Sequence, residues 1–208
     1  MHPDARVDGL SDARHVTSSS GAHQESVERG TRGGSQGTVR AAAVAVVRPG
    51  VDGVEVLLVQ RQSGTAFGGA WAFPGGGFEP SDRCGASRSG TVAMRAATRE
   101  LQEETAVVVA SDKLEPLLGP LVANDADRRF LVQFFLVWTE RSVSVRLNPA
   151  ELTAHQWLSP ANALRRVSAG TLRVPPATQA ALAELDRRVG LGEDGSQRAV
   201  GDPECPAG

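Results

Sequence analysis

Apolar residues occur in short blocks between about residues 37 and 189, and glycine, proline and charged residues separate the blocks. Blocks of this length that are rich in valine, leucine and aromatic residues predict buried strands, and the turn sequence at 48–53 predicts a hairpin between the first two. We expect strands at residues 38–47, 54–60, 107–109, 117–122, 130–138 and 155–158. Glycines at 75–77 should end the short apolar segment 71–73.

Three further segments show the spacing or the start signals of helices. Residues 91–105 form a helix-compatible run, and residues 175–188 place apolar side chains on one side of a helix. Ser159 before Pro160 indicates the start of another helix, because serine caps the first turn and proline fits its first position. Together the segments predict an α/β fold, with a mixed sheet, helices on its faces and no internal repeat.

The chain divides into one expected domain and two tails. Residues 37–189 hold the predicted strands and helices, whereas residues 1–36 and 190–208 are rich in small and polar residues with almost no apolar periodicity. Such composition is typical of disordered tails. A length of 208 residues suits a single domain with extensions, since a domain usually has about 100–200 residues.

Composition narrows the class of protein. With 40% hydrophobic residues, 22% charged residues and a net charge of −2, the chain does not resemble a polybasic nucleic-acid binder. The longest apolar run, residues 41–47, is far shorter than the ~18 residues of a membrane helix, and the polar N-terminus lacks the apolar core of a signal peptide. We therefore expect a cytoplasmic protein that binds neither membrane nor nucleic acid.

Cysteine and histidine offer no metal pattern. Cys84 and Cys205 are isolated, and three of the four histidines lie before residue 24. A disulfide framework or a zinc site is therefore not expected.

Three acids on the predicted helix 91–105 form the candidate chemical site. Glu100, Glu103 and Glu104 share one helix face, where like charges repel, so they favour a bound cation beside the preceding glycines. Arg99 lies four residues before Glu103 and can form an ion pair with it. The alternative is a solvated helix face with ordinary ion pairs.

These residues resemble the Nudix box of the Nudix hydrolases. The resemblance rests on Phe73-Pro-Gly-Gly-Gly77, on an acid six residues after Gly76, and on Arg99-Glu-Leu-Gln-Glu-Glu104. It implies an α/β/α sandwich with a mixed sheet. The chain departs from the family pattern in three places: Asp82 replaces the first glutamate, an insertion of roughly residues 83–90 precedes Arg99, and Ala106 replaces a glycine. None of these changes removes an expected ligand.

The resemblance also implies roles for the residues of the box. Glu100, Glu103 and Glu104 would bind Mg²⁺ or Mn²⁺, which takes hard oxygen ligands, and Arg99 would orient the acids. The backbone at Gly75, Gly76 and Gly77 would contribute to the metal and phosphate site. Two residues are candidates for the general base, Glu103 and the later Glu151, for which a solvated loop acid is the alternative.

The substrate is expected to contain a diphosphate, but several classes stay open. The resemblance extends diffusely to the acyl-coenzyme A diphosphatase-like branch, which implies cleavage of coenzyme A or an acyl derivative. ADP-ribose, nucleotide sugars, dinucleoside polyphosphates and nucleoside triphosphates are alternatives, as is a domain that senses nucleotides without cleaving them. A homodimer is a family expectation.

A few residues outside the box are candidates for substrate contacts. Arg61, Arg128 and Arg129 could contact phosphate, because a guanidinium matches phosphate oxygens, although each could equally be a surface arginine. Phe67, Trp71 and Trp138 could stack on a base or belong to the core.

Overall fold

The structure is a computed structural model that describes residues 37–84, 89–126 and 128–192. The two predicted tails, residues 1–36 and 190–208, lie outside these residues apart from 190–192. The described part contains no helix long and apolar enough to cross a bilayer.

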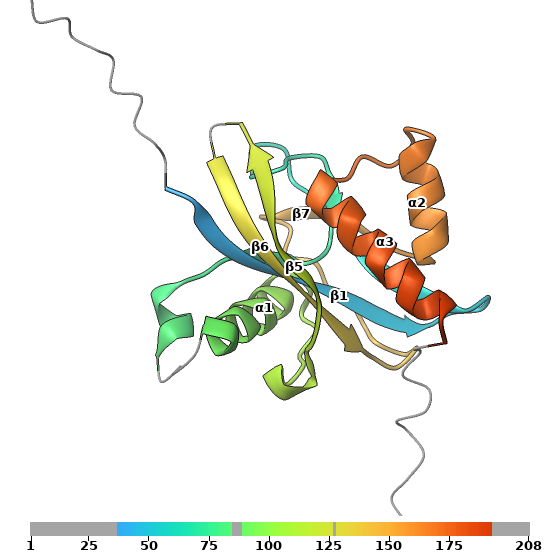
Figure 1. Ribbon diagram of the computed structural model, residues 1–208, viewed down its shortest axis with the longest axis horizontal. Coiled ribbons are helices and arrows are strands. Elements are labelled where there is room, and N and C mark those ends of the chain that lie inside the picture. The colour runs from blue at the N-terminus through green and yellow to red at the C-terminus, as the bar shows by residue number, and fades with distance from the viewer. Residues whose placement is uncertain (1–36, 85–88, 127, 193–208) are drawn as a thin grey trace, which may run out of the picture. The chain divides into compact units, whose positions relative to one another are not determined.

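The described strands form one mixed sheet (Figure 1). Its central strand, β1, pairs in parallel with β6 and antiparallel with both β2 and β4, while β7 and β5 extend the sheet at β2 and β6. The strands are β1 (Val39–Pro49), β2 (Val54–Arg61), β3 (Trp71–Ala72), β4 (Gly75–Gly77), β5 (Glu115–Asp125), β6 (Arg128–Trp138) and β7 (Leu152–Leu158).

Helices cover both faces of this sheet because β1 is apolar on both sides. Residues 41–47 are all buried, and alternate side chains along a strand point to opposite faces. Ala43 and Ala45 pack in the core beneath α2 (Pro160–Ser168) and α3 (Pro176–Gly190), whereas Val44 and Val46 pack in the core beneath α1 (Ser89–Thr105). The expected α/β/α sandwich is confirmed.

The helix starts and the first hairpin follow the sequence closely. The Ser159 hydroxyl accepts a hydrogen bond from the Asn162 N–H, and Pro160 occupies the first turn of α2. This cap satisfies one of the amides that a helix start leaves without a partner. β1 and β2 pair as the predicted hairpin.

The structure differs from the expectations about strands at three segments. Residues 107–109 form no strand, and Val108 is 71% exposed, because no described strand pairs with this segment. The glycines at 75–77 form β4, since β1 offers Ala41, Ala42 and Ala43 as partners to their backbone. The strands β5 and β6 extend beyond the expected 117–122 and 130–138, because pairing already joins Asp125 to Arg128.

Candidate active site

Arg99 on α1 holds most of the predicted acids together. Its Nη1 donates to Glu100 Oε1 at 2.9 Å and to Glu103 Oε2 at 3.0 Å, and its Nη2 donates to the Gly77 carbonyl at 2.9 Å. The guanidinium also contacts both carboxylate oxygens of Asp82 at 3.2 Å. One arginine therefore joins β4, the loop before α1 and the acidic helix face. We call Asp82, Arg99, Glu100, Glu103 and Glu104 the acid site.

Asp82 explains why the long spacing in the box does not disrupt this arrangement. It lies in the short 3₁₀ helix η1 (Pro80–Arg83), where its carboxylate is buried and accepts a hydrogen bond from the Glu79 N–H at 2.7 Å. Burial acts to raise the pKa of Asp82, but the hydrogen bonds from Arg99 and Glu79 outweigh it and lower this pKa. The insertion therefore separates Asp82 from Arg99 along the sequence, but the two side chains still contact each other in the structure.

Glu104 differs from the other acids because it is fully buried. Its Oε1 accepts a hydrogen bond from Arg61 Nη1, and its Oε2 accepts one from the Gly75 N–H at 2.9 Å. Burial raises the pKa of Glu104 to about 7, against the opposing effects of Arg61 and Gly75. Arg61, expected near phosphate, thus lies against this acid, at the point where β2 ends.

Glu100 lies directly against the glycine strand. A Cβ atom placed on Gly76 would lie 2.5 Å from the Glu100 carboxylate, which is closer than real Cβ contacts allow. Only glycine therefore fits here without movement. Burial raises the pKa of Glu100; Arg99 opposes this effect, and the charges of Glu103 and Glu151 add to it.

Glu151 joins the acids from the turn before β7. Its charge raises the pKa values of both Glu100 and Glu104, so it acts on the same region of space. The Asn148 side chain donates to Glu151 Oε1 at 3.1 Å, and the Gln62 N–H donates to the Glu151 carbonyl at 2.8 Å. Asn148 was not a candidate from the sequence, although its position three residues before Glu151 is the spacing of a local hydrogen bond.

The donor set suits a hard divalent cation in a particular way. Within the described ranges, no three histidine, cysteine or acidic side chains form a ready metal cage. Mg²⁺ does not need one, because it usually takes one or two carboxylates and completes its shell with waters and substrate phosphates. Glu100, held against Gly76, and Glu103, whose side chain is 53% exposed, provide such carboxylates.

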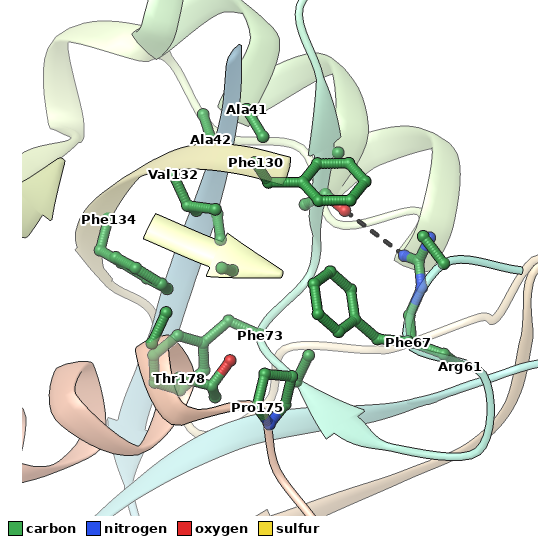
Figure 2. Close-up of a pocket in the computed structure, with 17 residues that line it drawn as sticks. Ala41, Ala42, Arg61, Phe67, Phe73, Phe130, Val132, Phe134, Pro175 and Thr178 are labelled. Carbon is green, nitrogen blue, oxygen red and sulfur yellow. Dashed lines mark hydrogen bonds between the residues drawn. The ribbon is translucent and has the colours of Figure 1, made fainter. Parts of the chain in front are cut away.

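An apolar pocket adjoins the acid site at β4, and Figure 2 shows the side chains that line it. The cavity has a volume of about 100 Å³, several times the ~10–15 Å³ that one water requires. Phe67 and Phe130 lie side by side in its wall, with ring centroids 5.4 Å apart. The lining residues are Ala41, Ala42, Ala43, Arg61, Ala66, Phe67, Ala72, Phe73, Gly75, Gly76, Ala123, Phe130, Val132, Phe134, Pro175, Ala177 and Thr178.

The remaining candidates do not join either region. Arg128 and Arg129 are exposed, and the Arg128 guanidinium lies 5.4 Å from the Phe130 ring centroid. Trp71 and Trp138 are half-buried and pack against the core beneath α2 and α3. Of the predicted aromatic contacts, only Phe67 lines the pocket.

The chain belongs to the NUDIX domain family, whose model matches residues 38–176. Solved structures agree with this assignment. A NUDIX hydrolase from Alicyclobacillus acidocaldarius is 25% identical, with a TM-score of 0.61 over 71% of this chain and 90% of that one.

Two more distant structures show the same fold. The NUDIX domain of Shewanella oneidensis NrtR, solved with ADP ribose, is 20% identical, with a TM-score of 0.56 over 74% of this chain and 89% of that one. A C. elegans Ap4A hydrolase is 18% identical, with a TM-score of 0.54 over 74% of this chain and 98% of that one. No curated protein matches the chain.

Proposed function

We propose that this protein is a Mg²⁺- or Mn²⁺-dependent hydrolase that cleaves the diphosphate linkage between a nucleoside and a second group. The observation that carries this proposal is the gathering of Asp82, Glu100 and Glu103 around Arg99, beside Gly75 and Gly76, where an added Cβ would lie within 3 Å of other atoms. A structural helix face does not require such a backbone approach. A site that holds a cation and a diphosphate against the backbone does.

In this proposal the acids bind the metal and Arg61 binds a phosphate of the substrate. Glu100 and Glu103 would hold the metal through their carboxylates, and Glu104 would join them once Arg61 turns from it to a substrate phosphate. The bound metal would neutralise phosphate charge and make an attacking water more acidic. Arg99 keeps Glu100 and Glu103 in place, so its role is to position them. The backbone of Gly75, Gly76 and Gly77 borders the same space.

The proton of the attacking water would pass to Glu103 or to Glu151. Glu103 lies on the exposed end of the acid site, whereas Glu151 faces Glu100 and Glu104 from a separate loop. A general base must lie within hydrogen-bond reach of the water it deprotonates, so the base would be whichever of the two residues reaches the water beside the metal.

Coenzyme A or an acyl derivative is the substrate that we propose first. ADP-ribose, nucleotide sugars and nucleoside triphosphates share the diphosphate and are the alternatives. The metal and the acid site act on the diphosphate itself, so the choice between these compounds depends on the surrounding pocket and loops.

Product analysis on a panel of diphosphates tests the proposal. We expect Mg²⁺- or Mn²⁺-dependent formation of monophosphate products from at least one of coenzyme A, ADP-ribose, NADH and a nucleotide sugar. Activity should disappear with EDTA and in the Glu103→Gln variant, whose exposed side chain should leave the melting temperature unchanged. An unchanged rate in that variant would rule out the proposed site.

One observation favours a second function, in which the domain binds a nucleotide without cleaving it. Both carboxylate oxygens of Glu104 are already bonded, one to Arg61 and the other to Gly75. If Arg61 keeps this contact when the ligand binds, the metal site stays incomplete. Calorimetric binding of ADP-ribose or coenzyme A without any product over hours, with Mg²⁺ or Mn²⁺ present, would select this function. A homodimer, a cytoplasmic location and the lack of a nucleic-acid partner stay predictions.

A further inference from the structure

The apolar pocket has almost no polar side chains with which to recognise a ligand. Of the 17 lining residues, only Arg61 and Thr178 carry polar side chains, and Arg61 is bonded to Glu104. Figure 2 shows Phe73, Phe130 and Phe134 around the cavity. A buried polar group of a ligand without a hydrogen-bond partner is costly. The pocket therefore suits a group that is mostly hydrocarbon.

Small residues of the sheet create the space that the phenylalanines surround. Ala41 and Ala43 lie on the β1 face toward α3, and Ala123 of β5 lies on the same side. Larger side chains at these positions would fill the cavity. The wall at Phe67 is held in place, because the Phe67 N–H donates to Asp125 at 3.0 Å while its backbone keeps a φ of 58°. A non-glycine residue at such a φ often marks a functional site.

Thr178 provides a single polar contact inside the apolar wall. It is only 5% exposed, on the first turns of α3, and its hydroxyl forms no hydrogen bond with a described residue. In Figure 2 its hydroxyl oxygen lies on the cavity side of α3, near Phe73 and Pro175. This hydroxyl borders the cavity and is not among the fully buried polar atoms without a partner, and a hydroxyl can donate one hydrogen bond and accept two, so it has capacity for a ligand.

The pocket begins where the acid site ends. Gly75 and Gly76 line the cavity, and the same two residues contact Glu104 and Glu100. A diphosphate held at the acid site would therefore place its directly esterified group, and not a more distant one, at the mouth of the pocket. Ribose is such a group, but its several oxygens would meet one hydroxyl and carbon walls.

We infer that the apolar pocket binds a branched aliphatic group that is esterified directly to the diphosphate and carries one hydroxyl, which bonds Thr178. The pantoyl end of coenzyme A has this chemistry: two methyl groups on one carbon next to the diphosphate ester, and a hydroxyl on the following carbon. This inference rests on the proposed function and adds that the group next to the diphosphate on the non-nucleoside side, the pantoyl end, lies in the pocket.

Dephospho-coenzyme A and ADP-ribose form a matched pair for the test, because they share ADP and differ only in the second group. We expect the wild-type kcat/KM for dephospho-coenzyme A to exceed that for ADP-ribose by about tenfold or more. Thr178→Val should lower this ratio by about fivefold, the effect of one lost hydrogen bond. Ala66→Leu, which narrows the pocket from its loop wall, should lower the ratio further. Thr91→Val, an exposed helical threonine outside the pocket, should leave the ratio unchanged.

Isopentenyl diphosphate tests the hydroxyl contact separately, since it carries a branched hydrocarbon group but has no nucleotide and no hydroxyl on that group. We expect isopentenyl diphosphate to be cleaved more slowly than dephospho-coenzyme A. Its rate of cleavage should fall no further in Thr178→Val than in the control Thr91→Val. Faster cleavage of isopentenyl diphosphate would overturn the hydroxyl contact, and a preference for ADP-ribose would overturn the inference while leaving the proposed function intact.

Binding without turnover keeps the inference testable if the proposed function fails. The Glu103→Gln variant is titrated by calorimetry with dephospho-coenzyme A and with ADP-ribose, and the same is done after adding Thr178→Val. Tighter binding of dephospho-coenzyme A that weakens about fivefold with Thr178→Val supports the pocket assignment. Equal affinities of Glu103→Gln for the two compounds would overturn the assignment. So would an unchanged ratio of the two affinities in the Glu103→Gln, Thr178→Val double variant, provided that its melting temperature is native.

Discussion

The acid site and the apolar pocket meet at β4, yet the chain builds them in different ways. Four side chains of the acid site lie within residues 99–104 of one helix, where helical spacing alone brings them to one side. The pocket takes its walls from β1, β5, β6, the loop after β2 and the start of α3. The proposed chemistry on a diphosphate would therefore depend mainly on local structure, whereas the proposed choice of the attached group would depend on tertiary packing.

The two regions also differ in charge. The acid site holds carboxylates whose repulsion is offset by Arg99 and Arg61. The pocket has apolar walls, with the Thr178 hydroxyl and the Arg61 guanidinium as its polar side-chain groups. Changes in the acid site should affect every substrate alike, and changes in the pocket should affect substrates selectively.

The largest expected effect comes from the two candidate bases. Glu103→Gln and Glu151→Gln are compared on dephospho-coenzyme A and ADP-ribose, with the exposed Glu140→Gln as the control. Glu103→Gln should lose activity in either case, because Glu103 is also a proposed metal ligand, so Glu151→Gln decides between the bases. A loss of about 100-fold or more in kcat would assign the base to Glu151, and a rate equal to that of Glu140→Gln would assign it to Glu103. The loss in either variant should be the same for both substrates. A loss confined to one substrate would show that this glutamate contributes to substrate selectivity. That result would contradict the distinction between the two regions.

A methyl group on the glycine strand should have the next largest effect. Gly76→Ala places a Cβ 2.5 Å from the Glu100 carboxylate, whereas Gly77→Ala meets its nearest atom, on Val39, at 3.6 Å. We expect kcat/KM to fall by about 10- to 100-fold in the first variant, because Glu100 must move. Gly77→Ala should remain within about threefold of wild type. Equal losses in the two variants would show that the approach at Gly76 is not what matters.

The end of α1 offers a smaller, stabilising change. Ala106 has a φ of 57°, in the left-handed region where alanine is strained and glycine is not. Ala106→Gly should raise the free energy of unfolding by about 0.5–1 kcal/mol, as measured by chemical denaturation. Ala110→Gly, at a φ of −74°, should lower it. A lower stability of Ala106→Gly would show that this helix end relaxes in solution.

The smallest effect is expected where α3, the helix that carries Thr178, is held on β5. Glu184 accepts hydrogen bonds from Arg187 and Arg188, which lower the pKa of Glu184 to about 2. Arg188 also donates to the Leu117 carbonyl at 2.8 Å. Glu184→Gln should cost at most about 1 kcal/mol at pH 7, as for other solvent-accessible pairs.

The pH dependence of this pair has a definite sign. Because the pKa of Glu184 in the folded protein lies below its ordinary value, the stabilisation is present above about pH 4.5 and is lost as the pH falls toward 2. Urea titrations between pH 2 and 7 should show a shallower decline for Glu184→Gln than for wild type. Parallel curves would mean that the pair contributes nothing measurable.

Much of the fold could be predicted because the signals are local. The apolar blocks at 38–47 and 130–138 became β1 and β6, and Ser159-Pro160 starts α2 as expected. The failures have a common cause. Residues 107–109 have the composition of a strand, but no described strand pairs with them. The glycines of β4 do not have the composition of a strand, but they pair with β1. Strand formation needs a neighbouring edge, which composition does not provide.

For the candidate site, the sequence by itself determined the row of Arg99, Glu100, Glu103 and Glu104, because helical periodicity fixes which residues share a face. Only the tertiary structure decided that Glu104 is buried against Arg61, that Asp82 reaches Arg99 across the insertion, and that Thr178 lies in an apolar wall. The physical reason is that burial and long-range contacts arise from how the helices and strands pack, and no spacing along the chain encodes which distant side chains will meet.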